Sequence, residues 1–264
     1  MNKTIVIRKK MSSEPGTPVR YYLDGFNLNF FLNRRISVKF EGFQCVQCKR
    51  YEPIFRQGLC KPCFFETPSA GDWVIRPELS QAHLDIEDRD LTYEKKVQLQ
   101  PHIVYFAVSS GLKVGVTQKT QLTTRLIDQG AQQAIPIIEV PNRYLAGITE
   151  VALKEYYNDK TNWRQMLTQT PQPIDLIAER ERALSHLPDE VKDYASSALQ
   201  EKTLLFDYPI NQSRIKRVQI LNMSKKLNFN GKLTGIKAQY LVFNNRDVLN
   251  IRFNEGLVLN IKTI

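Results

Sequence analysis

Alternating apolar and polar positions predict short β-strands at the start of the chain. Residues 36–40 alternate clearly, as in a strand with one buried face, and residues 4–8 alternate more weakly. Residues 21–23 form a further short strand-like run. We therefore predict an N-terminal β segment over residues 1–40, whose last strand leads directly into a cysteine-rich stretch.

A β-hairpin followed by helices and a further strand is predicted in the middle of the chain. The apolar runs 102–108 and 112–116 are separated by Ser-Ser-Gly, a turn sequence, and so predict the two strands of the hairpin. Apolar positions at helical spacing then predict helices over 120–129 and 143–157, on either side of a strand over 135–140. This pattern is typical of an α/β module.

The last third of the chain changes from a helical to a β pattern. Pro171 and Pro173 mark the boundary, and residues 174–203 are expected to form one or two polar amphipathic helices broken near Pro188. From Ile215 onward, short strand-like runs alternate with Gly and Asn turns. This alternation predicts a β-meander or a small barrel.

Together these patterns predict an α+β fold made of five parts. The parts are an N-terminal β segment (1–40), a cysteine module with an acidic connector (41–98), an α/β module (99–170), a helical linker (171–210) and a basic β domain (211–264). The sequence contains no internal repeat and no low-complexity tract.

The chain is basic, and its positive charge is concentrated at the two ends. The formal net charge is +10 and the pI is about 9.4. Residues 1–63 contain 12 Lys and Arg against 4 Asp and Glu, and residues 211–264 contain 10 against 2, so the rest of the chain is net acidic. Either end alone fits a solvated surface. Two basic ends favour a polyanionic partner, and nucleic acid, either DNA or RNA, is the commonest one.

The hydropathy of the chain predicts a soluble protein. No apolar stretch approaches the roughly 20 residues that a membrane-spanning helix needs. Residues 1–10 lack the long apolar run before a small-residue cleavage site that marks a signal peptide. We therefore expect a cytoplasmic protein without a membrane partner.

The four cysteines form two C-x2-C pairs, Cys45 with Cys48 and Cys60 with Cys63, separated by 11 residues. Two such pairs joined by a short loop are typical of a zinc ribbon, in which four thiolates hold one tetrahedral Zn2+. Because sulfur would fill all four positions, the ion would be structural rather than catalytic. Two disulfides are the alternative, which fits less well because C-x2-C spacing does not easily allow a relaxed disulfide within a pair.

The predicted α/β module carries a resemblance to a known superfamily. Tyr105 stands at the end of a first motif, Lys113-Val114-Gly115 forms a second, and the following helices carry Arg125 and Glu150. This order resembles the GIY-YIG nuclease superfamily, especially its divergent branch with Lys-Ile-Gly as the second motif. The resemblance implies that Tyr105, Lys113, Arg125 and Glu150 are catalytic, and that Glu150 binds a divalent ion, Mg2+ or Mn2+.

The resemblance also implies roles in phosphodiester hydrolysis. The tyrosine and its surroundings would activate water, the arginine would hold the scissile phosphate, and the metal on the glutamate would stabilise the leaving oxygen. Lys113 could help by lowering the pKa of Tyr105. Ile103 and Lys113 replace the Gly and Tyr of the family's motifs, and each site residue singly also fits a structural role. The alternative function is a non-catalytic scaffold that binds nucleic acid or protein.

Nearly the whole chain is also similar to an uncharacterised bacterial family, a domain of unknown function. The similarity lies in the two cysteine pairs and in residues 77–78, 110–117, 127–131, 159–164 and 235–241. It implies an architecture but no particular activity.

One further polar cluster, Asp159 to Arg164, follows the helix that carries Glu150. Asn162 could orient a phosphate or a water, and Trp163 or Arg164 could stack on a base. The structural alternative is a capping turn in which Thr161 or Asn162 caps a short helix and Trp163 packs inside.

Overall fold

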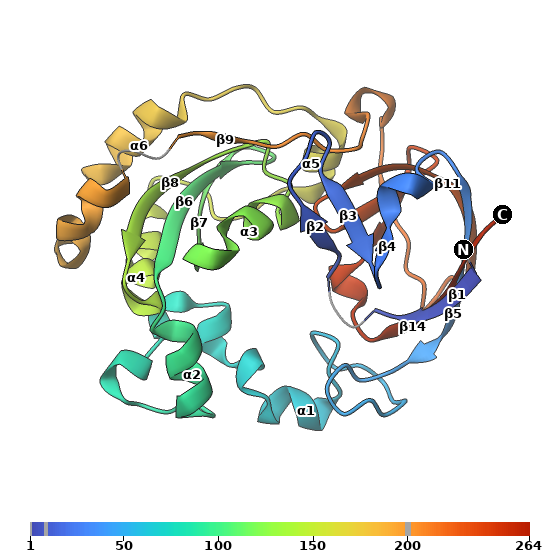
Figure 1. The fold of residues 1–264 in the computed structure, drawn as a ribbon, viewed down its shortest axis with the longest axis horizontal. Helices are drawn as coiled ribbons and strands as arrows, with labels where there is room; N and C mark the ends of the chain where they lie inside the picture. The colour runs from blue at the N-terminus through green and yellow to red at the C-terminus, as the bar shows by residue number, and fades with distance from the viewer. Residues whose placement is uncertain (1, 8–9, 199–201) are drawn as a thin grey trace. The chain divides into compact units, whose positions relative to one another are not determined.

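The computed structural model describes residues 2–7, 10–198 and 202–264 and divides the chain into two compact units. The terminal unit consists of Met1–Glu66, Trp163–Thr170 and Asp207–Ile264. The central unit consists of Thr67–Asn162 and Pro171–Phe206. Both units combine helices with sheets, so the predicted α+β class is confirmed (Figure 1).

Within the described residues, the terminal unit is built on one seven-stranded sheet. In spatial order its strands are β1 (Asn2–Val6), β14 (Leu257–Thr263), β5 (Arg35–Phe43), β11 (Asn228–Lys237), β12 (Tyr240–Phe243), β13 (Asp247–Asn250) and β10 (Gln219–Ile220). Strand β5 pairs antiparallel with both β14 and β11. The two β segments predicted separately at the chain ends therefore share one sheet, because pairing between distant strands leaves no mark in local periodicity.

The terminal unit also contains a small second sheet and several short helices. The second sheet has the order β2 (Ser12–Glu14), β3 (Arg20–Leu23), β4 (Phe26–Asn27). The helices are α1 (Lys61–Glu66), α5 (Trp163–Thr168) and the 3-10 turns η1 (Leu28–Phe31), η8 (Gln212–Arg214) and η9 (Arg252–Asn254).

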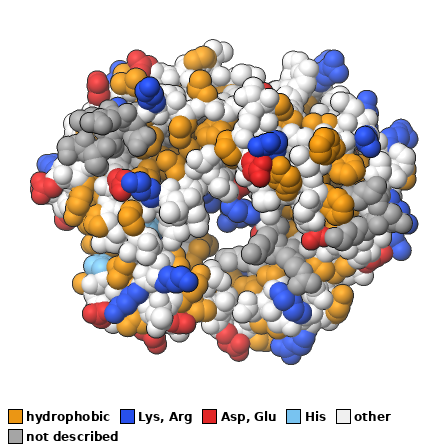
Figure 2. Space-filling view, viewed as in Figure 1, with side chains coloured by type: hydrophobic (Ala, Val, Ile, Leu, Met, Phe, Trp, Pro, Cys, Tyr) orange, Lys and Arg blue, Asp and Glu red, His pale blue; other side chains and the backbone are white. Residues whose placement is uncertain are grey.

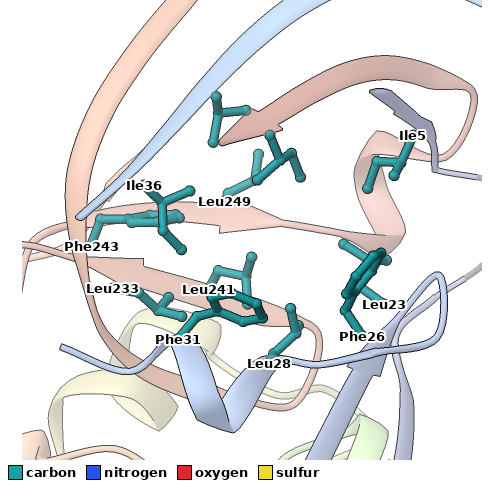
Figure 3. Close-up of a pocket in the computed structure, with 12 residues that line it drawn as sticks. Ile5, Leu23, Phe26, Leu28, Phe31, Ile36, Leu233, Leu241, Phe243 and Leu249 are labelled. Atoms are coloured by element: carbon teal, nitrogen blue, oxygen red, sulfur yellow. The ribbon is translucent and has the colours of Figure 1, made fainter. Parts of the chain in front are cut away.

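Apolar side chains from both sheets and from η1 meet in the core of the terminal unit (Figure 3). Leu23 and Phe26 come from the small sheet, whereas Leu233 and Phe243 come from the large one. They surround a cavity of about 20 Å3, which has room for about one water molecule. Because the residues that line it are all apolar, we regard it as a packing defect of the core.

One cation, Lys237 at the end of β11, is completely buried in the terminal unit. Its Nζ makes no hydrogen bond to the described residues and lies 5.2 Å from the centre of the Tyr208 ring. Burial lowers the pKa of Lys237 from 10.5 to about 8. The unfolded chain therefore binds a proton that the folded chain releases between these two pH values, so this residue destabilises the fold below about pH 8.

Replacement of Lys237 by Met is expected to stabilise the protein at pH 7 by roughly 1–3 kcal/mol, because an apolar chain of similar length avoids this cost. The difference from wild type should shrink as the pH rises from about 8 to 10.5. Urea unfolding at several pH values measures it. Lys232→Met, at an exposed position of the same strand, is the control and should change stability little. A destabilised Lys237→Met variant would contradict the prediction.

The central unit contains a four-stranded sheet within the described part of the chain. Its order is β7 (Leu112–Gln118), β6 (His102–Val108), β8 (Gln133–Val140), β9 (Leu204–Leu205). Its α-helices are α2 (Leu91–Gln98), α3 (Leu122–Asp128), α4 (Arg143–Leu153) and α6 (Leu176–Leu184). Its 3-10 segments are η2 (Pro68–Ala70), η3 (Asp72–Val74), η4 (Pro77–Leu79), η5 (Ala82–Leu84), η6 (Lys119–Gln121) and η7 (Asp189–Ala198).

The predicted hairpin is confirmed as the antiparallel pair β6 and β7. All seven residues of β6 are buried, because the sheet is covered on both faces. Alternate residues such as Ile103 and Tyr105 pack with α3, whereas Val104 and Phe106 pack with α4 and α6 (Figure 1). Because side chains along β6 alternate between the two faces of the sheet, Tyr105 faces α3.

The predicted helices of the central unit are present with shorter bounds. The helix expected over 143–157 ends at Leu153, and turns follow it. The helices expected over 174–203 correspond to α6 and η7, which are separated near Pro188, and residues 199–201 lie outside the described residues. Among the described helices, none is both long enough and apolar enough to cross a membrane.

Candidate metal centre and candidate active site

The four cysteines converge in the terminal unit. Their Sγ atoms all lie within 4.8 Å of one another. Four Zn–S bonds of about 2.3 Å in a tetrahedron would separate neighbouring sulfurs by about 3.8 Å. Cys48 Sγ and Cys60 Sγ are 3.8 Å apart. The cluster therefore has the donor set and the dimensions to hold a metal ion.

Local backbone geometry brings the sulfurs together. Lys49 follows the first pair with φ +64°, and Gly58 precedes the second pair with φ +73°, so each turn uses the left-handed region. The Cys60 N–H lies 3.4 Å from Cys45 Sγ, as a donor to that sulfur. Such amide donors stabilise thiolates in a cluster of this kind.

The thiols strongly affect one another's protonation. Burial raises the pKa of Cys45, but backbone N–H groups, that of Cys60 foremost, outweigh it and lower the pKa to about 6. A hydrogen bond with Cys60, together with burial, raises the pKa of Cys63 to about 12. Four thiolates so close together repel one another, and a bound cation would relieve this repulsion.

The four-cysteine module, residues 44–66, is attached to the large sheet just before β14. The Gln44 N–H donates a hydrogen bond to the Gly256 carbonyl, with a nitrogen–oxygen distance of 2.8 Å. A Cβ on Gly58 would lie 2.9 Å from Glu255 Cβ, so glycine is needed for this close approach. The module is thereby fixed to the large sheet through its first residue and its second turn.

In the central unit, Tyr105 packs directly on the second motif of the hairpin. Gly115 lies opposite Tyr105 in the β6–β7 ladder, and a Cβ on Gly115 would approach the Tyr105 hydroxyl to 2.8 Å. The Tyr105 side chain is completely buried. Arg125 and Gln129 lie near its hydroxyl, which completes no hydrogen bond with the described residues. Glycine at position 115 is thus required for the tyrosine ring to lie against the strand.

The pKa of Tyr105 does not follow the prediction made from its neighbours. Burial raises this pKa above 10.0, and the opposing effect of the Arg125 charge is smaller. Lys113 is not among the groups with the largest effects on it. The expected lowering of the Tyr105 pKa by Lys113 is therefore wrong, because loss of hydration outweighs the nearby positive charge.

Lys113 is itself buried, on the strand opposite Ala107. Burial, reinforced by the positive charge of Arg125, lowers the pKa of Lys113 to about 8, and Glu150 and Asp159 offset part of this change. The half-buried Arg125 comes from α3. Arg125 and Glu150 are thus both close enough to Lys113 to influence its charge.

Glu150 lies in the last turns of α4 and is also buried. Burial raises its pKa, and the ammonium of Lys154 offsets part of the rise. Lys154 Nζ lies 3.4 Å from Glu150 Oε2 and 3.7 Å from Asp159 Oδ2. A cation therefore bridges these two carboxylates, which shows that the position between them is electronegative.

Three charged neighbours of Glu150 had not been predicted as site residues, namely Glu78, Arg143 and Lys154. Gly147 explains the position of Glu78, because a Cβ there would lie 2.3 Å from the Glu78 backbone nitrogen. Arg143 donates from Nη2 to the Val74 carbonyl at 2.8 Å. A glycine inside a predicted helix was the one sequence signal for this packing.

The cluster that follows α4 is used to attach its loop to the hairpin. Val114 N–H donates to the Asn158 carbonyl at 2.9 Å, Thr161 Oγ1 lies 3.0 Å from Ser109 Oγ, and Asn162 N–H donates to Ser110 Oγ at 2.9 Å. These contacts bring Asp159 near Lys113. Trp163 is half-buried in the terminal unit and stacks on Tyr240, with ring centres 5.7 Å apart.

A model of one protein family matches residues 33–259, and its description is "Protein of unknown function (DUF2797)". The chain belongs to this family. The match spans the four-cysteine module, the hairpin and most of the large sheet, so the membership covers both units. No curated protein and no solved structure is significantly similar to the chain. Membership of the DUF2797 family identifies relatives but no function, so the function has to be inferred from the chemistry of the two sites.

Proposed function

We propose that this protein binds nucleic acid and is a metal-dependent, GIY-YIG-like endonuclease. The observation that carries the proposal is the electrostatic proximity of Lys113, Arg125 and Glu150, which come from three different elements, beside Tyr105. Buried charged residues are costly, and clusters of them with shifted pKa values are commoner at functional sites than elsewhere. The four residues come from β6, β7, α3 and α4 of the central unit.

Each residue has a role in phosphodiester hydrolysis that its chemistry supports. Arg125 is half-buried and would bind the scissile phosphate through its planar guanidinium. Glu150, with Asp159 nearby, would hold Mg2+ or Mn2+ at the position that Lys154 now approaches. A divalent ion there would stabilise negative charge on the phosphate and on the leaving oxygen.

Lys113 is better suited than Tyr105 to accept the proton of the attacking water. With a pKa of about 8, a minor fraction of Lys113 is neutral near physiological pH, larger than for an ordinary lysine, whereas the pKa of Tyr105 is raised. The water would transfer its proton to Lys113 Nζ as its oxygen bonds to phosphorus and the P–O bond to the leaving group breaks. Tyr105, which is wholly buried, would not touch the reactants and would instead help to position Arg125 beside it.

We infer that the four-cysteine module is a zinc ribbon with a structural ion. The sulfur separations fit tetrahedral Zn2+, and four thiolates leave no position for a water nucleophile. All four cysteines are free thiols and are therefore available as metal ligands. Zinc would then stabilise the terminal unit and would take no part in hydrolysis.

A non-catalytic scaffold is the second candidate, and one observation favours it. The Tyr105 side chain is completely buried against Gly115, so its main contribution could be to pack the hairpin. In this case the module would retain a nuclease-like fold and bind nucleic acid without cleaving it. Both candidates share the binding of a polyanion, which can be tested first.

Wild-type protein is expected to bind oligonucleotides with an affinity that falls steeply as salt rises, because binding releases counterions. The basic ends of the chain motivate this prediction. On the face drawn in Figure 2, basic side chains are interspersed with acidic and apolar ones, so net charge alone does not locate the binding surface. Fluorescence anisotropy at 50 and 200 mM salt should show a loss of at least about tenfold in affinity. Absence of binding at the lower salt would contradict the proposed function.

A further inference from the structure

A basic cavity of about 500 Å3 opens on the surface of the terminal unit. The described residues that line it include four cations and no acidic residue. The cations are Arg164, Lys216, Arg217 and Arg246, and all four are exposed. The cavity belongs to the terminal unit alone and contains none of the residues proposed for hydrolysis.

Three separate segments bring these charges together. Arg164 comes from α5, Lys216 and Arg217 precede β10, and Arg246 lies in the turn before β13. Strand β10 runs parallel to β13, with Gln219 opposite Asp247. This pairing of strands places the basic stretch beside the basic turn, although 28 residues or more separate them in the sequence.

Contacts within the unit hold two of the four cations, Arg246 and Arg164, in place before any ligand binds. Arg246 Nη2 donates to Gln219 Oε1 at 3.1 Å, and the Gln219 N–H donates to the Arg246 carbonyl at 2.9 Å. The Arg164 guanidinium lies 4.5 Å from the centre of the Trp163 ring, which in turn stacks on Tyr240. Beneath them, Val218 belongs to the buried core. This side of the cavity is therefore preorganised, which lowers the entropic cost of binding.

Four like charges around one cavity repel one another, so an anion that occupies it gains affinity from all four. The nearest acidic residue along the chain, Asp247, does not line the cavity, and its Oδ2 accepts a hydrogen bond from Asn244. Guanidinium groups suit phosphate oxygens because they offer planar, bidentate contacts. The volume exceeds what a single phosphate needs, and the four exposed cations suit a ligand with repeated phosphates.

We propose that this cavity binds the phosphodiester backbone of a nucleic-acid strand, as a docking site separate from the residues of the central unit. The identity of the ligand as a nucleic acid rests on the proposed function, whereas the cavity and its charges do not. Contacts to phosphate carry no sequence information. The site therefore contributes affinity and position but no base preference.

The test is a double variant, Lys216→Gln with Arg217→Gln, in the full chain. Because both side chains are exposed, the variant should fold like wild type, and its melting temperature checks this. Anisotropy with single-stranded and duplex oligonucleotides should show Kd raised about tenfold, with the slope of log affinity against log salt reduced by about 2. The form of nucleic acid with the larger loss is the one that the cavity prefers.

A control of equal charge change separates the cavity from overall charge. Lys225→Gln with Lys232→Gln removes two exposed cations of the same unit outside the cavity. Its Kd is expected to stay within about threefold of wild type, since only long-range attraction is lost. Equal weakening by both double variants would overturn the proposed site.

The remaining outcomes distinguish this site from the proposed function. If wild type binds oligonucleotides and the Lys216/Arg217 variant binds them equally well, the docking site is wrong while nucleic-acid binding stands. If wild type binds neither form of nucleic acid at low salt, both proposals fall. In a cleavage assay, the variant should raise KM and leave kcat unchanged, because the cavity holds no residue of the hydrolytic cluster.

Discussion

Removal of the metal is expected to unfold residues 45–63 and expose them to protease, while the large sheet of the terminal unit stays folded. Between Gln44 and Cys60, all of which are described, the chain forms turns and one isolated bridge but no helix or extended strand. The rings of Phe55, Phe64 and Phe65 contact one another, yet Phe55 and Phe65 are exposed, so this cluster is a poor core. The proposed metal would therefore supply most of the module's stability, because binding contributes about 10 kcal/mol or more in structural zinc sites.

Limited trypsin digestion measures this dependence, because Lys49, Arg50 and Arg56 are cleavage sites inside the module. With the metal bound, these sites should resist digestion, and a chelator should make them the first to be cut. The Cys60→Ser variant should be cut there with or without chelator. Tyr51→Ser, at a side chain that is 73% exposed, is the matched control and should behave like wild type.

Elemental analysis of protein purified without added metal identifies the ion. About one zinc per chain is expected, since four thiolates form one tetrahedral site. Protein with no bound metal, or a module that resists trypsin equally well in chelator, would contradict the prediction. Intact disulfides in mass spectrometry would do so as well.

Glu150→Gln is expected to abolish cleavage of nucleic acid, with a loss on the order of 10²-fold or more. The substitution keeps the shape of the side chain and removes the negative charge that would hold the divalent ion. Zinc content and oligonucleotide affinity should change little, because the proposed zinc site and the proposed docking cavity both lie in the terminal unit, away from Glu150 in the sequence. A gel assay with DNA and RNA substrates in Mg2+ or Mn2+ measures the loss.

Glu155→Gln is the matched control, since Glu155 is an exposed glutamate near the same helix end. It should cleave like wild type. If wild type cleaves no substrate with either metal, or if Glu150→Gln cleaves as fast as wild type, the scaffold function replaces the enzyme. Retained oligonucleotide binding would then support nucleic acid as the partner and contradict the predicted hydrolysis.

The pH profile of the same reaction tests the role of Lys113. The neutral amine is the form that accepts a proton, so the rate should rise with pH and level off above about 8. Lys113→Met should remove this rise together with most of the activity. A Tyr105→Phe variant that keeps the profile but lowers the rate would agree with a positioning role for the tyrosine.

Local patterns in the sequence were sufficient to predict the hairpin, the two helices after it and the cysteine pairs. The turn after Val108 and the apolar runs on both sides of it determine the hairpin through short-range chemistry. The C-x2-C spacing likewise brings its sulfurs together through turns that involve only neighbouring residues. The catalytic roles of Tyr105, Arg125 and Glu150 remain predictions, because proximity supports them without testing them.

Other features depended on contacts that no local pattern encodes. The basic cavity exists because β10 lies beside β13, and Glu78 approaches Glu150 because Gly147 lets α4 pack against a distant turn. Neither pairing alters the periodicity of its own segment, so both were missed from the sequence.

The sequence by itself determined the α+β class, the hairpin and the cysteine ligand set, since each follows from interactions among residues close along the chain. Only the tertiary structure decided how these parts combine: that β5 joins the two chain ends in one sheet, and that Tyr105 is wholly buried. Burial also determined the pKa values of the side chains proposed for hydrolysis. It raises the pKa of Tyr105 and lowers that of Lys113 to about 8, because hydration is lost only when distant segments pack around a side chain.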